Sequence, residues 1–381
     1  MPSYIVVGGG VLGASAAYHL AKAGAAVTLI DRADKGQATE AAAGIICPWL
    51  SQRRNKDWYR IAKAGAKYYP ELIAQLEEDG ETETGYKKTG ALSIHTGEEK
   101  LDKMQERALK RREDAPEIGE IKRLSPEETR GMFPLLSSGF SSVYVGGAAR
   151  VNGKALRDAL VNAARKNGAE VIHGNARLLV EGRKVIGVEA GGRTMHADKT
   201  IVAAGAWAKE LFKPLGATFQ VSHQKAQIIH LELPGTDTGG WPVVMPPNDQ
   251  YLLAFEGGRI IAGATHENTE EFDQRVTAGG LHEVLSKVLP VAQGLADAAI
   301  IDVKVGFRPF TPGFLPVIGA WPGFGGILAA NGLGASGLTV GPFFGAELAR
   351  LALGRETELD LSPYGLEQAI EHHSFRSGMK P

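Results

Sequence analysis

The stretch "SYIVVGGGVLGASAAYHLAKAGAAVTLIDRAD", residues 3–34, decides the fold. Its apolar run "YIVV" is typical of a short buried strand. A glycine-rich turn follows, and the next residues predict a helix that ends at Gly24. "AVTLID" then predicts a second strand that ends at Asp31. Strand, turn, helix and strand in this order are typical of a parallel α/β unit that binds a nucleotide.

The turn contains Gly8, Gly10 and Gly13 in the pattern G-x-G-x-x-G. Gly8 permits the tight turn, and Gly10 lets backbone N–H groups approach a pyrophosphate. Gly13 lets the helix pack closely on the strand, so that the helix N-terminus faces the phosphates. Asp31, about 20 residues further on, accepts both hydrogen bonds of a ribose diol. The pattern predicts a dinucleotide site rather than a glycine-rich helix start, and it leaves NAD and FAD open.

Composition narrows the class of protein. The 381 residues are enough for two domains or one large α/β unit, and the 49 glycines suit a fold with many tight turns. A net charge of −1 gives no electrostatic reason to expect nucleic acid or an anionic membrane as the main partner. Cys47 is the only cysteine, which excludes an intrachain disulfide and favours a reducing compartment.

No segment predicts export or membrane insertion. The N-terminus "MPSYIVVGGG" lacks the basic region and cleavage site of a signal peptide. The charge-free run after Arg308 is too interrupted by Gly and Pro to form a membrane span. We therefore expect a cytoplasmic protein with no transmembrane segment.

The rest of the chain alternates helical patterns with short strands. Glycine-punctuated strands over 177–205 predict a β-meander, and "FQVSHQKAQIIHLEL" (219–233) predicts a long strand with one exposed face. A hairpin is expected over 250–267, and a strand over 298–310 runs through Arg308. These patterns predict a nucleotide domain assembled from separate segments, with an antiparallel substrate domain inserted between them.

Five motifs resemble the D-amino-acid oxidase superfamily of FAD-dependent oxidoreductases, which includes glycine oxidase, sarcosine oxidase and D-amino-acid dehydrogenase. They are the N-terminal motif, "ATEAAAGIICP", "TIVAAGAWAKEL", "GFRPFTPGFLPVIG" and "AANGLGASGLTVGP", and they extend over nearly the whole chain. The resemblance implies FAD rather than NAD. It also implies an α/β fold, in which a Rossmann-type FAD-binding domain like that of glutathione reductase carries an inserted α+β substrate domain with an antiparallel sheet.

The resemblance implies a discontinuous domain division. The FAD-binding domain is expected to comprise residues 1–84, 142–218 and 308–375. The substrate domain is expected to comprise 85–141 and 219–307, with 376–381 as a tail.

The family motifs also imply which residues contact FAD. The three glycines would hold the pyrophosphate. Asp31 would hold the adenosine ribose, and Arg32 follows it in the sequence. The other positions would surround the flavin or close over the nucleotide, and a helix N-terminus would stabilise the anionic reduced flavin. The implied set is Gly8, Gly10, Gly13, Asp31, Arg32, Thr39, Ala43, Gly44, Ile45, Gly205, Trp207, Gly334, Gly337, Leu338 and Thr339.

Three departures from the family pattern affect the details. No cysteine follows the arginine motif, where sarcosine-oxidase relatives bond covalently to the flavin, so non-covalent FAD is expected. Ala335 lies where glycine oxidases carry a second arginine, which is closer to the D-amino-acid dehydrogenase pattern. "HQKAQ" (223–227) replaces the usual Arg-Gly-Gln.

Arg308 is the leading candidate for substrate binding. No charged residue follows it until Glu347, and a lone buried charge is costly unless something anionic meets it. A guanidinium offers two parallel donors that fit a carboxylate. The alternative is a structural ion pair with an acid such as Asp302 or Glu267.

Two further residues are candidates for the substrate pocket. Tyr251 is a second carboxylate ligand or an ordinary strand tyrosine, and His266 is a pocket side chain or a structural histidine. Lys225 and His223 are weaker candidates. The pair His372-His373 is not expected to bind metal, and the sequence predicts no metal site.

Together with these residues, the resemblance implies an FAD-dependent oxidase of small amino acids: glycine, a D-amino acid or sarcosine. A hydride would pass from the α-carbon to flavin N5, the imine would hydrolyse to the oxo acid, and O₂ would become H₂O₂. One alternative is a D-amino-acid dehydrogenase that passes electrons to a quinone or another carrier. Another, of a different class, is a non-catalytic FAD-binding subunit. A homo-oligomer is also expected.

Overall fold

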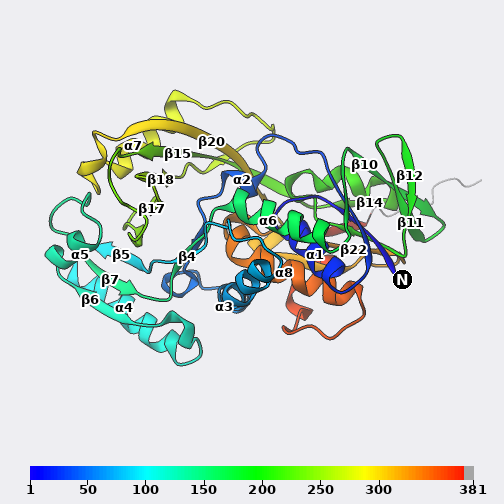
Figure 1. Ribbon diagram of the computed structural model, residues 1–381, viewed down its shortest axis with the longest axis horizontal. Helices are drawn as coiled ribbons and strands as arrows, with labels where there is room; N and C mark the ends of the chain where they lie inside the picture. The colour runs from blue at the N-terminus through cyan, green and yellow to red at the C-terminus, as the bar shows by residue number, and fades with distance from the viewer. Residues whose placement is uncertain (373–381) are drawn as a thin grey trace, which may run out of the picture.

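A computed structural model describes residues 1–372, so the tail predicted at 376–381 and His373 lie outside the described residues. The chain forms two lobes along its long axis (Figure 1). One lobe is built on a six-stranded, mainly parallel sheet and the other on a nine-stranded, mainly antiparallel sheet. The predicted α/β fold is confirmed.

The six-stranded sheet forms the centre of the nucleotide lobe. Its order is β21-β22-β13-β1-β2-β9, and every pair is parallel except β21–β22. The strands are β1 (Ser3–Val7), β2 (Ala26–Asp31), β9 (Glu170–His173), β13 (Lys199–Val202), β21 (Val317–Ala320) and β22 (Ile327–Asn331). The central strands β1, β13 and β22 are mostly buried, as expected for a parallel sheet that is covered on both faces.

Alternate residues of β1 reach the two layers around the sheet. Tyr4 and Val6 join a core formed with four helices, α1 (Val11–Lys22), α3 (Lys56–Glu78), α6 (Gly153–Lys166) and α8 (Gly337–Ala352). Ile5 and Val7 face the opposite core. That core is covered by β10 (Ala176–Glu181), β11 (Lys184–Ala190), β12 (Arg193–His196) and the 3-10 segment η3 (Gly205–Leu215).

The nine-stranded sheet forms the substrate lobe. Its order is β19-β15-β18-β17-β16-β5-β7-β6, and β20 pairs with the free side of β15. The strands are β5 (Ala91–His95), β6 (Ile121–Leu124), β7 (Ser141–Val145), β15 (Ser222–Glu232), β16 (Val243–Met245), β17 (Tyr251–Ala254), β18 (Arg259–Gly263), β19 (Glu267–Asn268) and β20 (Ala299–Phe310). Its helices are α4 (Glu98–Arg112), α5 (Pro126–Met132) and α7 (Ala278–Val288).

Several short elements lie outside the two large sheets. They are α2 (Ala38–Ala41), β3 (Ile45–Ile46), β4 (Lys87–Lys88), β8 (Ala149–Arg150), β14 (Ala217–Phe219) and β23 (Ile370–His372). The 3-10 turns are η1 (Pro48–Leu50), η2 (Pro116–Ile118), η4 (Gln293–Leu295), η5 (Pro312–Phe314), η6 (Gly334–Ser336), η7 (Ser362–Tyr364) and η8 (Leu366–Ala369).

The structure corrects two details of the sequence interpretation. The meander predicted over 177–205 is real for β10–β12, but β13 leaves it and joins the parallel sheet between β1 and β22. "TIVAA" is a continuous apolar run, which suits a strand that is buried on both faces. The substrate sheet is antiparallel except for the parallel pair β5–β16.

The domain division remains a proposal, which the sheets help to refine. A boundary at 142 would cut β7, and one at 308 would cut β20, although both strands belong to the nine-stranded sheet. We therefore place the boundaries after these two strands.

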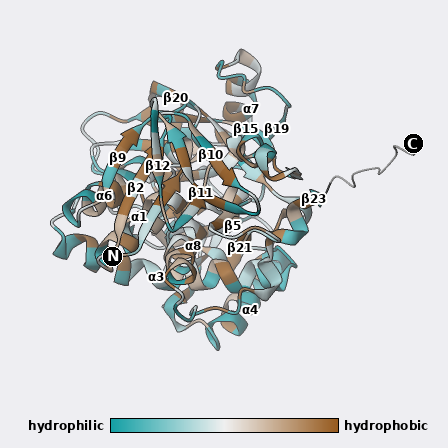
Figure 2. Cartoon of the chain, turned by 90° about the vertical axis from the view of Figure 1, so that its right-hand side faces the viewer, coloured by the Kyte–Doolittle hydropathy of each residue, from teal (hydrophilic) through white to brown (hydrophobic). Residues whose placement is uncertain are grey.

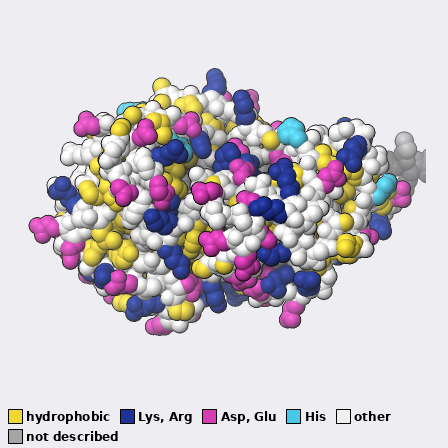
Figure 3. Space-filling model, in the orientation of Figure 1, with side chains coloured by type: hydrophobic (Ala, Val, Ile, Leu, Met, Phe, Trp, Pro, Cys, Tyr) yellow, Lys and Arg dark blue, Asp and Glu magenta, His cyan; other side chains and the backbone are white. Residues whose placement is uncertain are grey.

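Polarity follows the layers. In Figure 2 much of the hydrophobic colour lies in the central strands, and the outer helix α4 is largely hydrophilic. On the face drawn in Figure 3, Lys and Arg side chains alternate with Asp and Glu. Within residues 1–372, no helix is both long enough and apolar enough to cross a membrane.

Candidate active site

A cavity of about 1050 Å³ lies where the two lobes meet, with walls from both. The nucleotide lobe contributes the residues around the first turn of α1, the end of β2, residues 174–179, η3 and the segment between β22 and α8. The substrate lobe contributes β17, His266 and the second half of β20. This volume is at the upper end for small-molecule sites, as an extended dinucleotide requires.

Asp31 is placed by the end of β2 at the cavity wall. Its carboxylate accepts hydrogen bonds from the backbone N–H groups of Gly9 and Ala33, and from Gln37 Nε2 at 2.8 Å. Arg32 also lines the cavity, and it forms an ion pair with Asp34 at 2.6 Å. Three hydrogen bonds therefore hold the Asp31 carboxylate in a fixed orientation at the cavity wall.

Close backbone contacts shape the glycine turn and the segment after α2. Gly8 has a φ of +107°, and a Cβ there would lie 2.4 Å from the carbonyl oxygen of Ala203. Gly44 has a φ of +96°, and its Cβ would lie 1.8 Å from the Val151 carbonyl oxygen. Gly13 is placed behind the cavity, where a Cβ would lie 1.9 Å from the Gly8 carbonyl oxygen. The turn therefore excludes side chains on both sides.

Two helix N-termini face the cavity, those of α1 and α8. Neither helix has an acidic residue in its first turn, so their partial positive charges remain for an anionic ligand. Thr39 Oγ1 accepts the Val11 N–H at 3.0 Å, and Thr339 Oγ1 donates to the Ile45 carbonyl at 3.0 Å. The side-chain-free turn, Asp31 and the two helix N-termini fit FAD.

An aromatic wall closes the cavity beside η3. Asn331 Nδ2 donates to the Gly205 carbonyl at 2.9 Å and fixes the start of this segment. Trp207 lines the cavity and stacks on Phe272, with ring centroids 4.9 Å apart and planes at 12°. Phe307 meets Trp207 edge-on at 6.2 Å.

Arg308 lies on β20 and lines the cavity. Its Nη1 donates to Gln224 Oε1 over 3.4 Å, a long contact, and no ion pair joins it to an acid anywhere in residues 1–372. Asp302 is exposed, and Glu267 binds Gln227 and Thr265 instead. The ion pair considered as the structural alternative is thus not formed.

Burial acts on the charges around Arg308. It lowers the pKa of the Arg308 guanidinium, and the nearby Tyr251 hydroxyl opposes that shift. It also raises the pKa of Tyr251 to about 12, despite the opposing effect of Arg308, so the phenol stays protonated at neutral pH. Burial and Arg308 lower the pKa of His266, whose Nδ1 lies 3.9 Å from Asp249 Oδ2. The resulting site holds one fixed cation and two neutral hydrogen-bonding groups.

The predicted site residues line this one cavity, with three exceptions: Gly13 and the two weaker candidates, His223 and Lys225. The sequence interpretation missed three residues of the site. Gln37 orients Asp31, and Gln224 contacts Arg308. Asp249 lies beside His266. Gln224 had a signal, since it lies in the unusual "HQKAQ" stretch. Gln37 and Asp249 lie in loops, where a polar residue needs no functional explanation.

The cavity has the features of an FAD site, and comparison with known proteins agrees. Residues 3–351 match the family described as "DAO: FAD dependent oxidoreductase". The chain belongs to this family. It is an FAD-dependent oxidoreductase, as its motifs predicted.

Relatives of known sequence and structure cover almost the whole chain. The chain is 67% identical over 365 residues to the uncharacterized oxidoreductase YurR of Bacillus subtilis (strain 168), with 96% of this chain and 98% of that protein covered. It is 31% identical over 365 residues to a glycine oxidase of Pseudomonas aeruginosa, covering 94% and 97%. The crystal structure of iminodiacetate oxidase (IdaA) from Chelativorans sp. BNC1 superposes with a TM-score of 0.92 at 44% identity, covering 95% and 98%.

Proposed function

We propose that this protein is an oxidase of small amino acids whose substrate carboxylate binds Arg308. The observation that carries the proposal is a guanidinium in the wall of the FAD cavity without an acid partner in residues 1–372. A buried cation of this kind is stabilised when an anionic ligand binds it. The planar fork of Arg308 matches a carboxylate, so glycine, a D-amino acid or sarcosine would supply the missing charge.

Tyr251 and His266 complete the proposed substrate pocket. The protonated Tyr251 hydroxyl can donate a hydrogen bond to the same carboxylate that binds Arg308. His266 is mainly neutral at pH 7, because its pKa is lowered, and it can accept a hydrogen bond from the substrate amine. Together they orient the α-carbon, and orientation contributes several kcal/mol to such reactions.

Bound FAD would supply the redox chemistry, accepting the hydride that leaves the substrate α-carbon. The substrate amine would become an imine as the hydride leaves, and water would hydrolyse it to the oxo acid, releasing ammonia or, from an N-substituted substrate, an amine. The chain has a single cysteine, the buried Cys47, so we propose that FAD is bound non-covalently. Acid precipitation is expected to release the yellow colour into the supernatant, and colour retained in the pellet would show a covalent link.

Iminodiacetate is a second substrate candidate. The solved structure at 44% identity is of an iminodiacetate oxidase, and iminodiacetate is a glycine whose nitrogen carries a second carboxymethyl group. His266 lines the cavity together with Arg308, and we propose that it contacts the second arm. A higher kcat/KM for iminodiacetate than for glycine would favour this substrate.

The test is an anaerobic screen of small amino acids and iminodiacetate for bleaching of the flavin absorbance. A substrate should bleach the flavin, and admitted air should restore the colour and yield H₂O₂. Slow recovery in air, with fast recovery on adding a quinone, would favour the dehydrogenase. No bleaching by any of these amines would favour the non-catalytic FAD-binding subunit and contradict the proposal.

A further inference from the structure

The segment between β18 and α7 begins and ends in the substrate lobe, and its middle contacts the nucleotide lobe. We call residues 265–277 the strap. Apart from the two residues of β19, the strap has no regular secondary structure. His266, near its start, lines the cavity, and Thr277, at its end, caps α7 by accepting the Gly280 N–H at 3.1 Å. Because sheet hydrogen bonds do not hold residues 269–277, side chains must do so.

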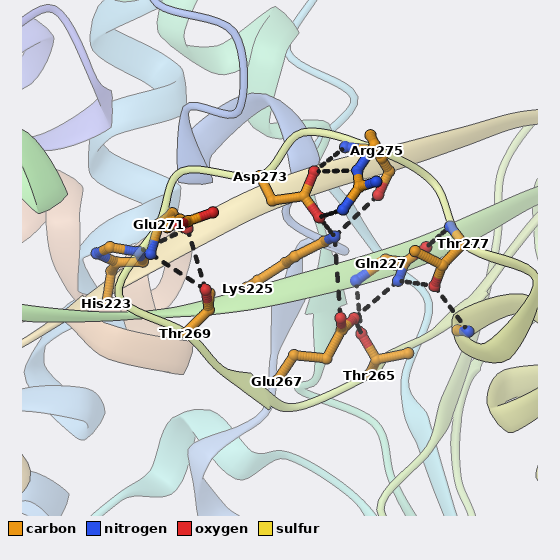
Figure 4. Close-up of polar contacts among 11 residues, drawn as sticks. His223, Lys225, Gln227, Thr265, Glu267, Thr269, Glu271, Asp273, Arg275 and Thr277 are labelled. Carbon is orange, nitrogen blue, oxygen red and sulfur yellow. Dashed lines mark hydrogen bonds and ion pairs between the residues drawn. The ribbon is translucent and has the colours of Figure 1, made fainter.

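Lys225 of β15 is the main anchor of the strap (Figure 4). Its Nζ lies 2.9 Å from the Arg275 carbonyl oxygen, 3.2 Å from Asp273 Oδ2 and 3.9 Å from Glu267 Oε2. Lys225 is only 2% exposed, so its ammonium depends on these acceptors. One buried charge therefore joins the beginning of the strap to its middle.

Gln227, two residues along β15 and on the same face, is a second anchor. Its Nε2 donates to Glu267 Oε1 at 2.8 Å and to Thr277 Oγ1 at 3.0 Å. Its Oε1 accepts the Thr277 N–H at 2.9 Å. Both ends of the strap are thereby attached to one strand of the substrate lobe.

The middle of the strap covers the cavity wall. Phe272 stacks between Trp207, at 4.9 Å, and His223, at 4.2 Å, and meets Phe307 edge-on at 5.0 Å. Trp207 and Phe307 line the cavity, whereas Phe272 lies outside them and is 37% exposed. Gln274 Nε2 adds a second contact with the nucleotide lobe, to the Lys35 carbonyl at 3.2 Å.

We propose that the strap is the outer wall of the FAD compartment and that Lys225 is a positioning residue that slows the release of FAD. Lys225 does not line the cavity, so it acts through Asp273, which fixes the strap beside Phe272. When the ion pair between Lys225 and Asp273 is formed, Phe272 holds the Trp207 ring in the wall. When this ion pair is lost, Phe272 moves away from Trp207, the wall opens more often, and FAD dissociates faster.

The test measures the rate of FAD release after rapid dilution of the holoprotein, followed by flavin fluorescence. Lys225→Met and Phe272→Ala should each raise this rate about tenfold or more. Lys225→Arg, which keeps the charge, should stay within about threefold of the parent. Val276→Ala is the matched control, because Val276 is an exposed residue of the same strap at 43% and is outside the aromatic stack.

Two further readouts separate positioning from a general loss of stability. If Lys225 acts through Phe272, the double variant that combines Lys225→Met with Phe272→Ala should release FAD about as fast as the faster of these two single variants. Trypsin should also cleave after Arg275 faster in Lys225→Met, while the melting temperature of the apoprotein changes little. The Arg275 side chain is already 84% exposed, so trypsin can reach it in the parent. What Lys225 holds is the Arg275 backbone carbonyl, and its release should speed cleavage.

Parental FAD release in folded Lys225→Met or in Phe272→Ala would overturn the proposal, as would additive effects in the double variant. If Lys225→Met does not fold, Asp273→Asn removes the same ion pair from the strap side, and parental release in that variant overturns it. These readouts use FAD alone. They therefore stand or fall independently of the substrate proposed for Arg308.

Discussion

The nucleotide half and the substrate half of the cavity are built in different ways. The nucleotide half uses backbone and glycine from short, contiguous stretches, such as the turn at Gly8 and the segment at Gly44. The substrate half uses the side chains of Tyr251, His266 and Arg308, which come from three separate segments of the other lobe. Because the family is FAD-dependent and its named relatives include a glycine oxidase and an iminodiacetate oxidase, we expect the first half to tolerate little change and propose that the second carries the substrate specificity.

The largest expected effect is in the substrate half. Arg308→Ala should lower kcat/KM at least a hundredfold, because loss of a buried charged partner costs roughly 3–5 kcal/mol. Arg308→Lys should recover little, since an ammonium lacks the planar fork. FAD content, read from the absorbance ratio, should stay at the parental level. A large loss of FAD in Arg308→Ala would mean that the two halves are not separate.

In the nucleotide half, Gly8→Ala should destabilise the fold by about 2–4 kcal/mol and abolish FAD retention. The reason is the overlap of the new Cβ with the Ala203 carbonyl at a φ of +107°. Gly24→Ala is the control, since Gly24 also has a positive φ, +81°, but has nothing within 4 Å of its Cβ position. Denaturant unfolding measures the loss of stability in both variants, and Gly24→Ala should lose only about 1–2 kcal/mol of its free energy of unfolding. Equal losses would show that close approach does not matter at Gly8.

Asp31→Ala should weaken FAD binding about 10- to 100-fold for each ribose hydrogen bond that it removes, because a charge-assisted hydrogen bond contributes about 1.5–3 kcal/mol. The measurement is a fluorescence titration of the apoprotein with FAD. Asp302→Ala, which removes an exposed acid of β20, should leave the affinity unchanged. Parental affinity in Asp31→Ala would remove Asp31 from the cofactor site.

The smallest effect concerns His19, which lies outside both halves of the cavity. Burial, with help from nearby cations, lowers its pKa to about 3, and Tyr68 Oη lies 2.7 Å from its Nε2. In the unfolded state His19 binds a proton near pH 6.5, but in the folded state it stays neutral until the pH is close to 3. The contribution of neutral His19 to the free energy of unfolding is therefore complete above pH 6.5 and falls as the pH decreases toward 3. His19→Gln should flatten this fall by at most about 1.4 kcal/mol per pH unit, read from unfolding at pH 4–6. An unchanged slope would contradict a neutral His19.

The sequence predicted the nucleotide half more completely than the substrate half, for a physical reason. Backbone recognition needs glycines at fixed spacing, so Gly8, Gly10 and Asp31 are visible within one stretch. Arg308 was visible because no charged residue follows it until Glu347. Gln224 was signalled only by the unusual "HQKAQ" stretch, since a polar residue in a strand looks the same whether it faces solvent or an arginine. The strap was missed because its anchors are distant in sequence, such as Lys225 and Asp273.

The central claim is that Arg308 recognises a carboxylate, and a two-by-two comparison tests it most directly. The rate of anaerobic flavin bleaching is measured for the parent and Arg308→Ala, each with the best amino acid and with the corresponding amine that lacks the carboxylate. We predict that only the parent with the amino acid reacts fast, and that the amine loses little further rate in the variant. An Arg308→Ala variant that loses as much rate on the amine as on the amino acid, or none on either, would contradict the account.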